Sequence, residues 1–124
     1  MRSLLLMSTL VIVAAASGAR AEGILGDWAR GDGGARVHIE PCGQALCAIN
    51  TWIKDPASSE KVGDRLVMKV QPIGPSTMKG EAYDPQRNLT LAFQIDIASP
   101  RSMTTKGCVL GGIICKDMGW TRLN

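Results

Sequence analysis

The stretch LTLAFQIDI, residues 89–97, decides the fold class of this chain. Large apolar residues occupy every second position from Leu89 to Ile97, and Thr90, Gln94 and Asp96 stand between them. This period of two predicts a β-strand with one buried and one solvated face, because a helix would bring every third or fourth residue to one side. We therefore expect the chain to be built from strands.

Shorter runs of the same kind lie on both sides of this strand. Residues 35–41 and 65–70 alternate between apolar and polar side chains, and residues 46–53 are rich in strand-forming types. Turn residues separate the runs, and the last one, residues 102–123, predicts a hairpin around Gly111 and Gly112. About eight short strands with short connections predict a single antiparallel, mostly meandering eight-stranded barrel.

The N-terminus has the three parts of a secretory signal peptide. One basic residue, Arg2, precedes an apolar run of 13 residues from Leu4 to Ala16, and the segment ends in Ala19-Arg20-Ala21. The apolar run is too short to span a bilayer core, which needs about 20 residues. We expect residues 1–21 to be a signal peptide and residues 22–124 to be one barrel domain in the periplasm or secreted.

The charges predict no strongly charged partner. The whole chain has a net charge of +3, and removal of Arg2 and Arg20 with the signal peptide would leave +1. The basic residues are scattered rather than gathered in a run, so the sequence predicts neither a nucleic acid nor an acidic membrane surface as partner. We expect a monomer without a transmembrane segment in its mature part.

The four cysteines, Cys42, Cys47, Cys108 and Cys115, predict disulfides, because an even number in a small exported domain indicates an oxidising compartment. A zinc site prefers pairs with two to four residues between the cysteines. Cys42 and Cys47 are at the limit of this spacing, but Cys108 and Cys115 have six residues between them, and neither pair is the Cys-x-x-Cys of a redox motif. Chain entropy would favour long-range bridges. Each pair nevertheless straddles a glycine-containing turn, where facing hairpin residues lie within disulfide reach, so we expect local bridges, 42–47 and 108–115. No metal or cofactor is expected.

Several motifs in sequence order resemble one bacterial family. They are V-x-I-E-P-C-G-x-x-L-C (37–47), W-I-K-D-P (52–56), Y-D-P (83–85), G-C-V-L-G-G-I-I-C-K (107–116) and W-T-R (120–122). In this order and spacing the chain resembles the family catalogued as domain of unknown function 2147, with departures at Ala48 and after Pro85, where we expect glycine. The resemblance implies a small exported lipocalin-like barrel and brings no established activity.

The triplet Gly26-Asp27-Trp28 and the late Arg122 also resemble the lipocalin and wider calycin arrangement. That resemblance implies that Trp28 closes one end of the barrel and that Arg122 packs across it. A guanidinium stacks well on an indole face and can bond to open backbone carbonyls at the same time. Both residues are therefore expected to be structural.

The barrel interior is the most promising place for a function. Strand parity predicts that it is lined by Val37, Ile39, Ile49, Ile53, Leu66, Met68, Val70, Leu91, Phe93, Ile95 and Ile97. Eight strands enclose enough volume to be filled by side chains or to hold one small ligand, and both alternatives stay open. These residues carry no charge, so a ligand would be lipid-like or aromatic.

Two other functions compete with ligand binding. The loops at residues 55–64 and 71–77 are polar or rich in Pro and Gly, and an inhibitor of proteases or lysozymes would use such loops to enter a periplasmic protein partner. An enzyme is less favoured, because the single histidine, His38, lies by parity on the solvent face beside Arg36 and Glu40. We expect no catalytic residue.

Overall fold

The computed structural model describes residues 7–8 and 21–124. Apart from residues 7, 8 and 21, the expected signal peptide lies outside the described residues. The described strands are β1 (Gly26–Arg30), β2 (Ala35–Cys42), β3 (Ala45–Ile53), β4 (Arg65–Pro72), β5 (Thr77–Asp84), β6 (Leu89–Ser99), β7 (Ser102–Val109) and β8 (Ile114–Arg122). Two short 3₁₀ helices, η1 (Ala21–Ile24) and η2 (Leu110–Gly112), complete the fold.

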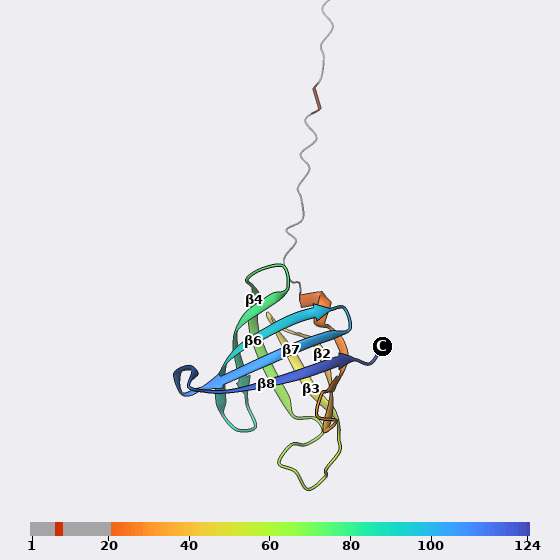
Figure 1. Ribbon diagram of the computed structural model, residues 1–124, viewed down its shortest axis with the longest axis vertical. Coiled ribbons are helices and arrows are strands. Elements are labelled where there is room, and N and C mark those ends of the chain that lie inside the picture. The colour runs from red at the N-terminus through yellow and green to blue at the C-terminus, as the bar shows by residue number, and fades with distance from the viewer. Residues whose placement is uncertain (1–6, 9–20) are drawn as a thin grey trace, which may run out of the picture.

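The strands form one closed barrel in which every strand lies next to its neighbours in sequence, and β1 pairs with β8 (Figure 1). All the pairings are antiparallel. The expected all-β meandering barrel is therefore confirmed. No helix among the described residues is both long enough and apolar enough to cross a membrane.

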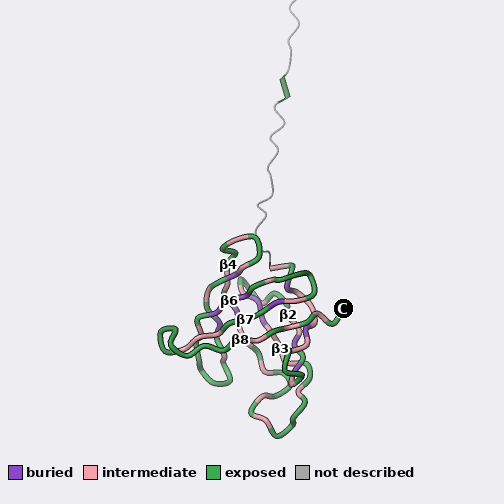
Figure 2. The backbone as a smooth tube through the Cα atoms, viewed as in Figure 1, coloured by how far each residue is buried: buried purple, intermediate pink, exposed green. Residues whose placement is uncertain are grey.

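The core lies inside the barrel, because alternate residues of each strand point inward. On β2, Ala35, Val37 and Ile39 are buried, while Arg36 and Glu40 between them are exposed. Figure 2 shows buried positions alternating with exposed ones along the strands. The buried apolar cluster is formed by Ile24, Trp28, Val37, Ile39, Leu46, Met68, Met78, Ala82, Phe93, Ile95 and Met103.

One end of the barrel is closed by Trp28, whose side chain is completely buried. Its indole Nε1 donates a hydrogen bond to the carbonyl oxygen of Ile24 in η1 at 2.9 Å. The Arg122 guanidinium lies over the indole, 4.3 Å from the ring centroid, and donates to the carbonyl oxygens of Leu25 (2.6 Å) and Pro100 (2.8 Å). We call this the closed end; the loops 31–34, 54–64, 85–88 and 110–113 lie at the opposite, open end.

Both disulfides close hairpins, as expected. Cys42 bonds to Cys47 across the β2–β3 turn at the closed end, with an S–S distance of 2.04 Å. Cys108 bonds to Cys115 across the β7–β8 hairpin at the open end, with an S–S distance of 2.17 Å. The two bridges therefore hold hairpins at opposite ends of the barrel.

The β7–β8 hairpin extends beyond the rest of the barrel wall. The pairing of β6 with β7 stops at Cys108, and β1 pairs with β8 only from Trp120 to Arg122. The hairpin consequently projects from the side of the barrel in Figure 1. Below we call residues 106–117 the arm.

Candidate ligand-binding cavity

A cavity of about 210 Å³ lies inside the barrel and opens at the open end. Its apolar wall comes from facing strands: Val37, Ile39, Ala48, Leu66, Met68, Phe93, Ile95, Met103 and Trp120. The Trp120 indole, on β8, donates a hydrogen bond from Nε1 to Thr105 Oγ1 on β7 at 2.9 Å, so the polar atom of this large ring is satisfied within the wall. The barrel is therefore not completely filled by its own side chains.

The structure brings six of the eleven expected lining residues to this cavity: Val37, Ile39, Leu66, Met68, Phe93 and Ile95. Three others lie elsewhere in the interior. Val70 and Ile97 pack against the buried cluster, and Ile53 pairs with the buried Ala35 at the end of β3. Leu91 lines a second, more open hollow that continues toward the arm.

The structure corrects the expectation for Ile49. Its neighbours Ala48 and Asn50 both line the cavity, so Ile49 between them points to the opposite face, where it pairs with His38. The β2–β3 register shifts between Arg36 and Val37, and this bulge puts Ile53 on the other parity from Ile49. A strict period of two along β3 cannot place both residues correctly.

The mouth of the cavity is charged, contrary to the expected apolar lining. Arg30, at the end of β1, forms a two-pronged ion pair with Glu60 of the 54–64 loop, with N–O distances of 2.7 and 2.9 Å. The same guanidinium contacts Asp32 at 2.9 Å. Hydrogen bonding to Arg30 lowers the pKa of Glu60 and of Asp32, and bonding to Glu60 raises the pKa of Arg30. All three groups therefore stay charged at neutral pH.

A second polar group lies across the mouth on the β5–β6 turn. Asp84 accepts a hydrogen bond from the Arg87 guanidinium at 2.9 Å and another from the Gln86 amide at 2.7 Å. Burial would raise the pKa of Asp84, but the hydrogen bonds from Arg87 and Gln86 outweigh it and lower that pKa. Gln86 also binds the backbone of Arg65 through both of its amide atoms, at 2.8 and 2.9 Å. The start of β4 is thereby tied to this turn.

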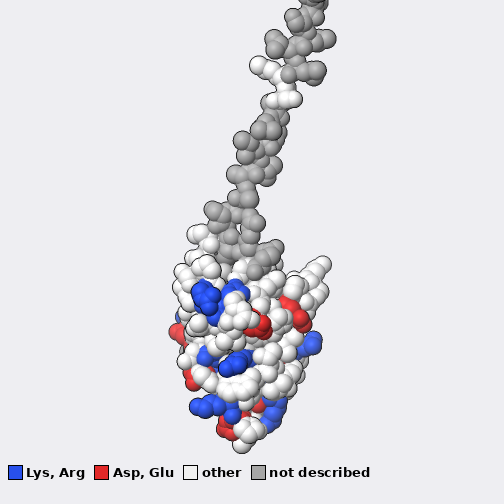
Figure 3. All heavy atoms as spheres, turned by 90° about the vertical axis from the view of Figure 1, so that its right-hand side faces the viewer, with Lys and Arg blue, Asp and Glu red and all other residues white. Residues whose placement is uncertain are grey.

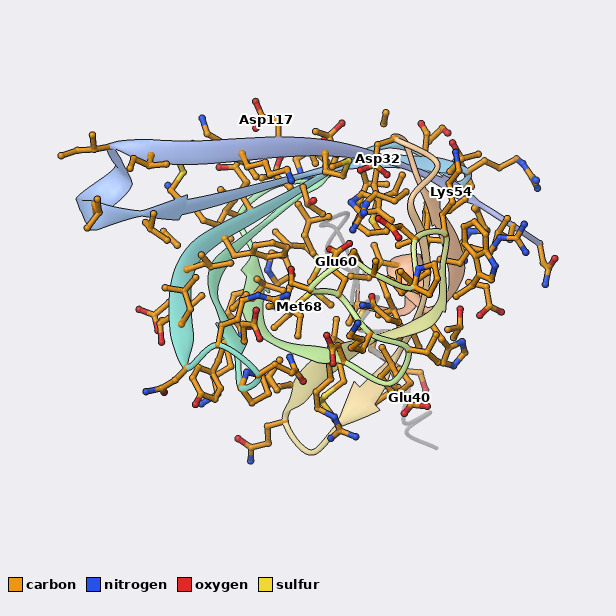
Figure 4. All side chains as sticks on the ribbon, turned by 90° about the horizontal axis from the view of Figure 1, so that it is seen from below. Asp32, Glu40, Lys54, Glu60, Met68 and Asp117 are labelled. Carbon is orange, nitrogen blue, oxygen red and sulfur yellow. A yellow bond between two sulfur atoms is a disulfide. The ribbon has the colours of Figure 1, made fainter. Side chains whose placement is uncertain are left out.

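The 54–64 loop is held in place by its own polar contacts. The Lys61 ammonium donates to the carbonyl oxygens of Pro56 and Ser58, and the Lys61 amide donates to the Asp64 carboxylate at 3.0 Å. With the loop held in this shape, Glu60 lies at the mouth of the cavity. Figure 4 views the molecule from below, where Glu60 and Met68 both lie near the middle of the ring of strands.

The loop at residues 71–77 is shorter than expected. Strand β4 continues through Pro72 and β5 begins at Thr77, so only residues 73–76 connect them. The reason is a backbone hydrogen bond from Ile73 to Thr77 at 2.9 Å, which closes the turn tightly. Ile73 is 59% exposed at this tip.

His38 lies outside the cavity, on the outer face of β2. Its Nδ1 is 2.9 Å from the Asp27 carboxylate and its Nε2 is 3.7 Å from Glu40, and its side chain is 40% exposed. No serine or cysteine nucleophile contacts this histidine among the described residues. In the same part of the chain, no group of three His, Cys, Asp or Glu side chains is placed to hold a metal ion.

Positive and negative side chains are interspersed on the molecular face in Figure 3, and neither sign forms a continuous field there. A nucleic-acid surface would gather lysine and arginine on one face. This face therefore offers no basic patch of that kind.

Comparison with known proteins identifies a family and a fold. A family described as "Uncharacterized protein conserved in bacteria (DUF2147)" matches residues 26–122. Among solved structures, a redesigned β-barrel is similar, with a TM-score of 0.55 and 20% identity over 83% of this chain and 94% of that one. At this identity the likeness concerns the fold alone. No curated protein matches the chain.

Proposed function

The chain belongs to the bacterial family DUF2147, and we propose that it is a binding module, without enzymatic activity, that holds one small apolar molecule inside its barrel. The observation that carries this proposal is the cavity of about 210 Å³ behind an open, polar mouth. Nine apolar side chains form a wall inside the barrel, and nine polar or charged residues complete the lining, among them Arg30, Glu60 and Asp84 at the mouth. An apolar wall with polar groups that can orient a ligand is typical of small-molecule sites.

The volume limits the ligand. A dry apolar cavity of roughly 150 Å³ is enough to hold a benzene-sized molecule, whereas sites for drug-sized ligands measure about 300–1,000 Å³. The cavity lies between these values, so its ligand is a single ring system or a short chain. A polar end of such a molecule would reach the rim near Arg30 and Gln86.

The state of the rim carboxylates supports binding rather than catalysis. A general acid or base at neutral pH needs a pKa near 7, which enzymes obtain by raising the pKa of a carboxyl group. Hydrogen bonds with Arg30 and Arg87 instead lower the pKa of Glu60 and Asp84. The charged, hydrogen-bonded carboxylates of Glu60 and Asp84 therefore serve to hold the mouth of the cavity in a fixed shape.

A titration with toluene tests the proposal. The methyl groups of Met68 and Met103 lie in the cavity wall and report on its contents by NMR. We expect their signals to shift with toluene, and we expect Ala48→Leu, which fills the cavity, to abolish the shift. The matched control is Ala92→Leu on the exposed face of β6. Equal shifts in both variants would refute a ligand site in the barrel.

The natural occupant can be sought directly. Native mass spectrometry of protein purified from its own cell envelope should show a small molecule bound to the wild type and absent from Ala48→Leu. A bare polypeptide mass in both samples would count against the proposal.

The proposed compartment is the periplasm or the exterior of the cell. The two disulfides support an oxidising location.

A role as an interaction or inhibitor protein is the second candidate, favoured by two exposed aliphatic residues on the loops considered above. Val62 is 64% exposed on the 54–64 loop, and Ile73 is exposed at the opposite end. Capture from envelope extracts should be compared for the wild type and for Val62→Ser with Ile73→Ser. If the same proteins are captured by both forms, these loops do not carry the interaction.

A further inference from the structure

Thr105 is a polar residue in the wall of the cavity, on a strand face that is otherwise apolar. On β7, Met103 is buried, and Thr105 two positions later lies on the same face of the strand. Thr105 pairs across the strands with Ile95, another buried residue of the wall. It lines both the cavity and the more open hollow that continues toward the arm. A molecule in the barrel therefore has this hydroxyl group beside it.

The neighbours of Thr105 lie at the mouth of the cavity. The Trp120 indole donates to Thr105 Oγ1 at 2.9 Å, and Trp120 pairs with Arg30 where β8 meets β1. Arg30 in turn forms the two-pronged ion pair with Glu60 at the mouth. A ligand whose polar end lies near Arg30 therefore also lies beside the pair formed by Thr105 and Trp120.

The hydrogen bond from Trp120 uses only the acceptor capacity of Thr105. An indole N–H can only donate, so Thr105 Oγ1 is the acceptor in this bond and its own proton remains available. The hydroxyl groups of Thr51 and Thr77 do donate, to a backbone carbonyl and to the Asp96 carboxylate. Among the described residues, no atom accepts a hydrogen bond from Thr105. A molecule in the cavity can therefore accept this proton.

The charges around the mouth do not favour an ionised ligand. Three arginines and three acidic residues line the cavity, so their charges cancel. The Arg30 guanidinium already contacts the carboxylates of Glu60 and Asp32, and Lys116 in the adjoining hollow lines it together with Glu60. A carboxylate ligand would compete with these anions and would also lose its hydration. A neutral ligand avoids both costs.

We propose that Thr105 selects the ligand, which is a neutral molecule with a hydrogen-bond acceptor oxygen, such as that of a ketone, an ether or an alcohol, bound to the Thr105 hydroxyl group. This inference rests on the proposed function, because it names the chemical class of the molecule in the same cavity. The apolar part of the ligand contacts the wall, including Phe93 and Ile95. Sequence parity predicted only the apolar part of this lining.

Two ligands of nearly the same shape test the proposal. Acetophenone has a carbonyl oxygen where α-methylstyrene has a methylene group, and each is a single ring system of the kind expected for the cavity. Benzoate is the anionic counterpart. The affinity of each molecule is measured by NMR titration, followed through the methyl signals of Met68 and Met103 in the cavity wall.

The variants are compared in a Trp120→Phe protein, because replacing Thr105 alone would leave the indole N–H without its acceptor. The test variant adds Thr105→Val, which nearly preserves the shape of the side chain and removes the hydroxyl group. The matched control adds Thr104→Val, since Thr104 lies on the exposed face of the same strand. Thermal unfolding of each variant verifies that it is folded.

We expect Thr105→Val to lower the affinity for acetophenone, relative to α-methylstyrene, by about fivefold, because one neutral hydrogen bond is lost. The control should leave this ratio unchanged. In the wild type, we expect acetophenone to bind more tightly than benzoate. We also expect a nuclear Overhauser effect between the methyl groups of acetophenone and Thr105, a measurement that depends on no variant.

The outcomes separate this inference from the proposed function. If both neutral molecules bind and their relative affinity is the same with and without the Thr105 hydroxyl group, Thr105 serves only to hold Trp120, and the cavity remains a ligand site. Tighter binding of benzoate than of acetophenone, or no Overhauser effect at Thr105 in the bound state, would also overturn the inference. If neither neutral molecule binds to the wild type, the inference and the proposed function fail together.

Discussion

At the scale of single residues, Arg122 connects the last strand to the N-terminal segment at the closed end of the barrel. Its guanidinium stacks on Trp28 and bonds to carbonyl oxygens of η1, of residue 25 and of the β6–β7 turn. These groups come from both ends of the sequence, up to 99 positions apart. One side chain therefore holds the first and last strands together.

We expect Arg122→Ala to lower the free energy of unfolding by about 2–3 kcal/mol, because it removes charge-assisted hydrogen bonds and the stacking contact. Urea denaturation of wild type and variant measures the change. Arg101→Ala, an exposed arginine at the same end, is the control and should change stability by less than about 0.5 kcal/mol. An Arg122→Ala protein as stable as the control would show that the stack is dispensable.

The Arg30–Glu60 pair makes stability depend on pH. The folded-state pKa of Glu60 lies below its usual value of 4.5, so its contribution to stability is present at neutral pH and is lost as pH falls through the folded pKa. We expect Glu60→Gln to be less stable than wild type at pH near 7 and equally stable in strong acid. Urea denaturation at both pH values measures this convergence. A constant difference between the proteins would contradict it.

At the scale of the elements, Gly80 allows β4 and β5 to approach closely. A Cβ atom at Gly80 would collide with the backbone carbonyl oxygen of Lys69 on β4 and stand 3.0 Å from Val70 Cα. Because these are backbone atoms, only a shift of the strand could relieve the collision. The two strands can therefore lie this close together only because residue 80 has no side chain.

We expect Gly80→Ala to lower the free energy of unfolding by about 3 kcal/mol, the upper part of the usual range for overpacking. Gly119→Ala on β8 is the matched control, since a Cβ there meets nothing within 4 Å. It should be neutral or slightly stabilising, because alanine has less freedom in the unfolded chain. Thermal unfolding of both variants measures the contrast, and equal melting temperatures would show that β4 moves without cost.

The sequence predicted a strand most reliably where apolar residues occupy every second position. The alternation from Leu89 to Ile97 predicted β6, which extends from Leu89 to Ser99. The same reasoning was wrong for Ile49, because the bulge that separates the parity of Ile49 and Ile53 depends on the pairing of β3 with β2. A register shift between two strands leaves no periodic signal in either strand alone.

At the scale of the whole molecule, the closure of the barrel is its weakest pairing. Only three residue pairs join β1 to β8, from Trp28–Arg122 to Arg30–Trp120, whereas eight pairs join β5 to β6. Two further backbone bonds extend the seam, from Gly31 to Gly119 and from Leu123 to Asp27. A short seam of this kind opens more readily than a long one.

We expect the amides of Ala29 and Thr121 in the seam to exchange hydrogen at least about tenfold faster than those of Ala82 and Leu91 in the β5–β6 pair, because local opening exposes the less supported bonds first. Hydrogen exchange followed by NMR measures the rates. Uniform protection around the barrel would show that it opens only by global unfolding.

The candidate site was only partly predictable from the sequence. Parity identified much of the apolar wall, such as Met68 and Phe93, because it depends on each strand alone. The charged rim depends on a contact between Arg30 and Glu60, which lie 30 positions apart and are joined by an irregular loop. The sequence of this loop has no periodic pattern, so the contact between Arg30 and Glu60 could be found only from the structure.

The pairing of the first strand with the last has a consequence for how the chain is made. A growing polypeptide can form the hairpins from β2 to β7 in the order of synthesis, since each strand pairs with the one before it. Strand β1 has only one partner until Trp120, Thr121 and Arg122 exist, and Trp120 comes 90 positions after its partner Arg30. A nascent chain therefore cannot close its barrel until these residues have been synthesised, and until then one edge of β1 stays unpaired.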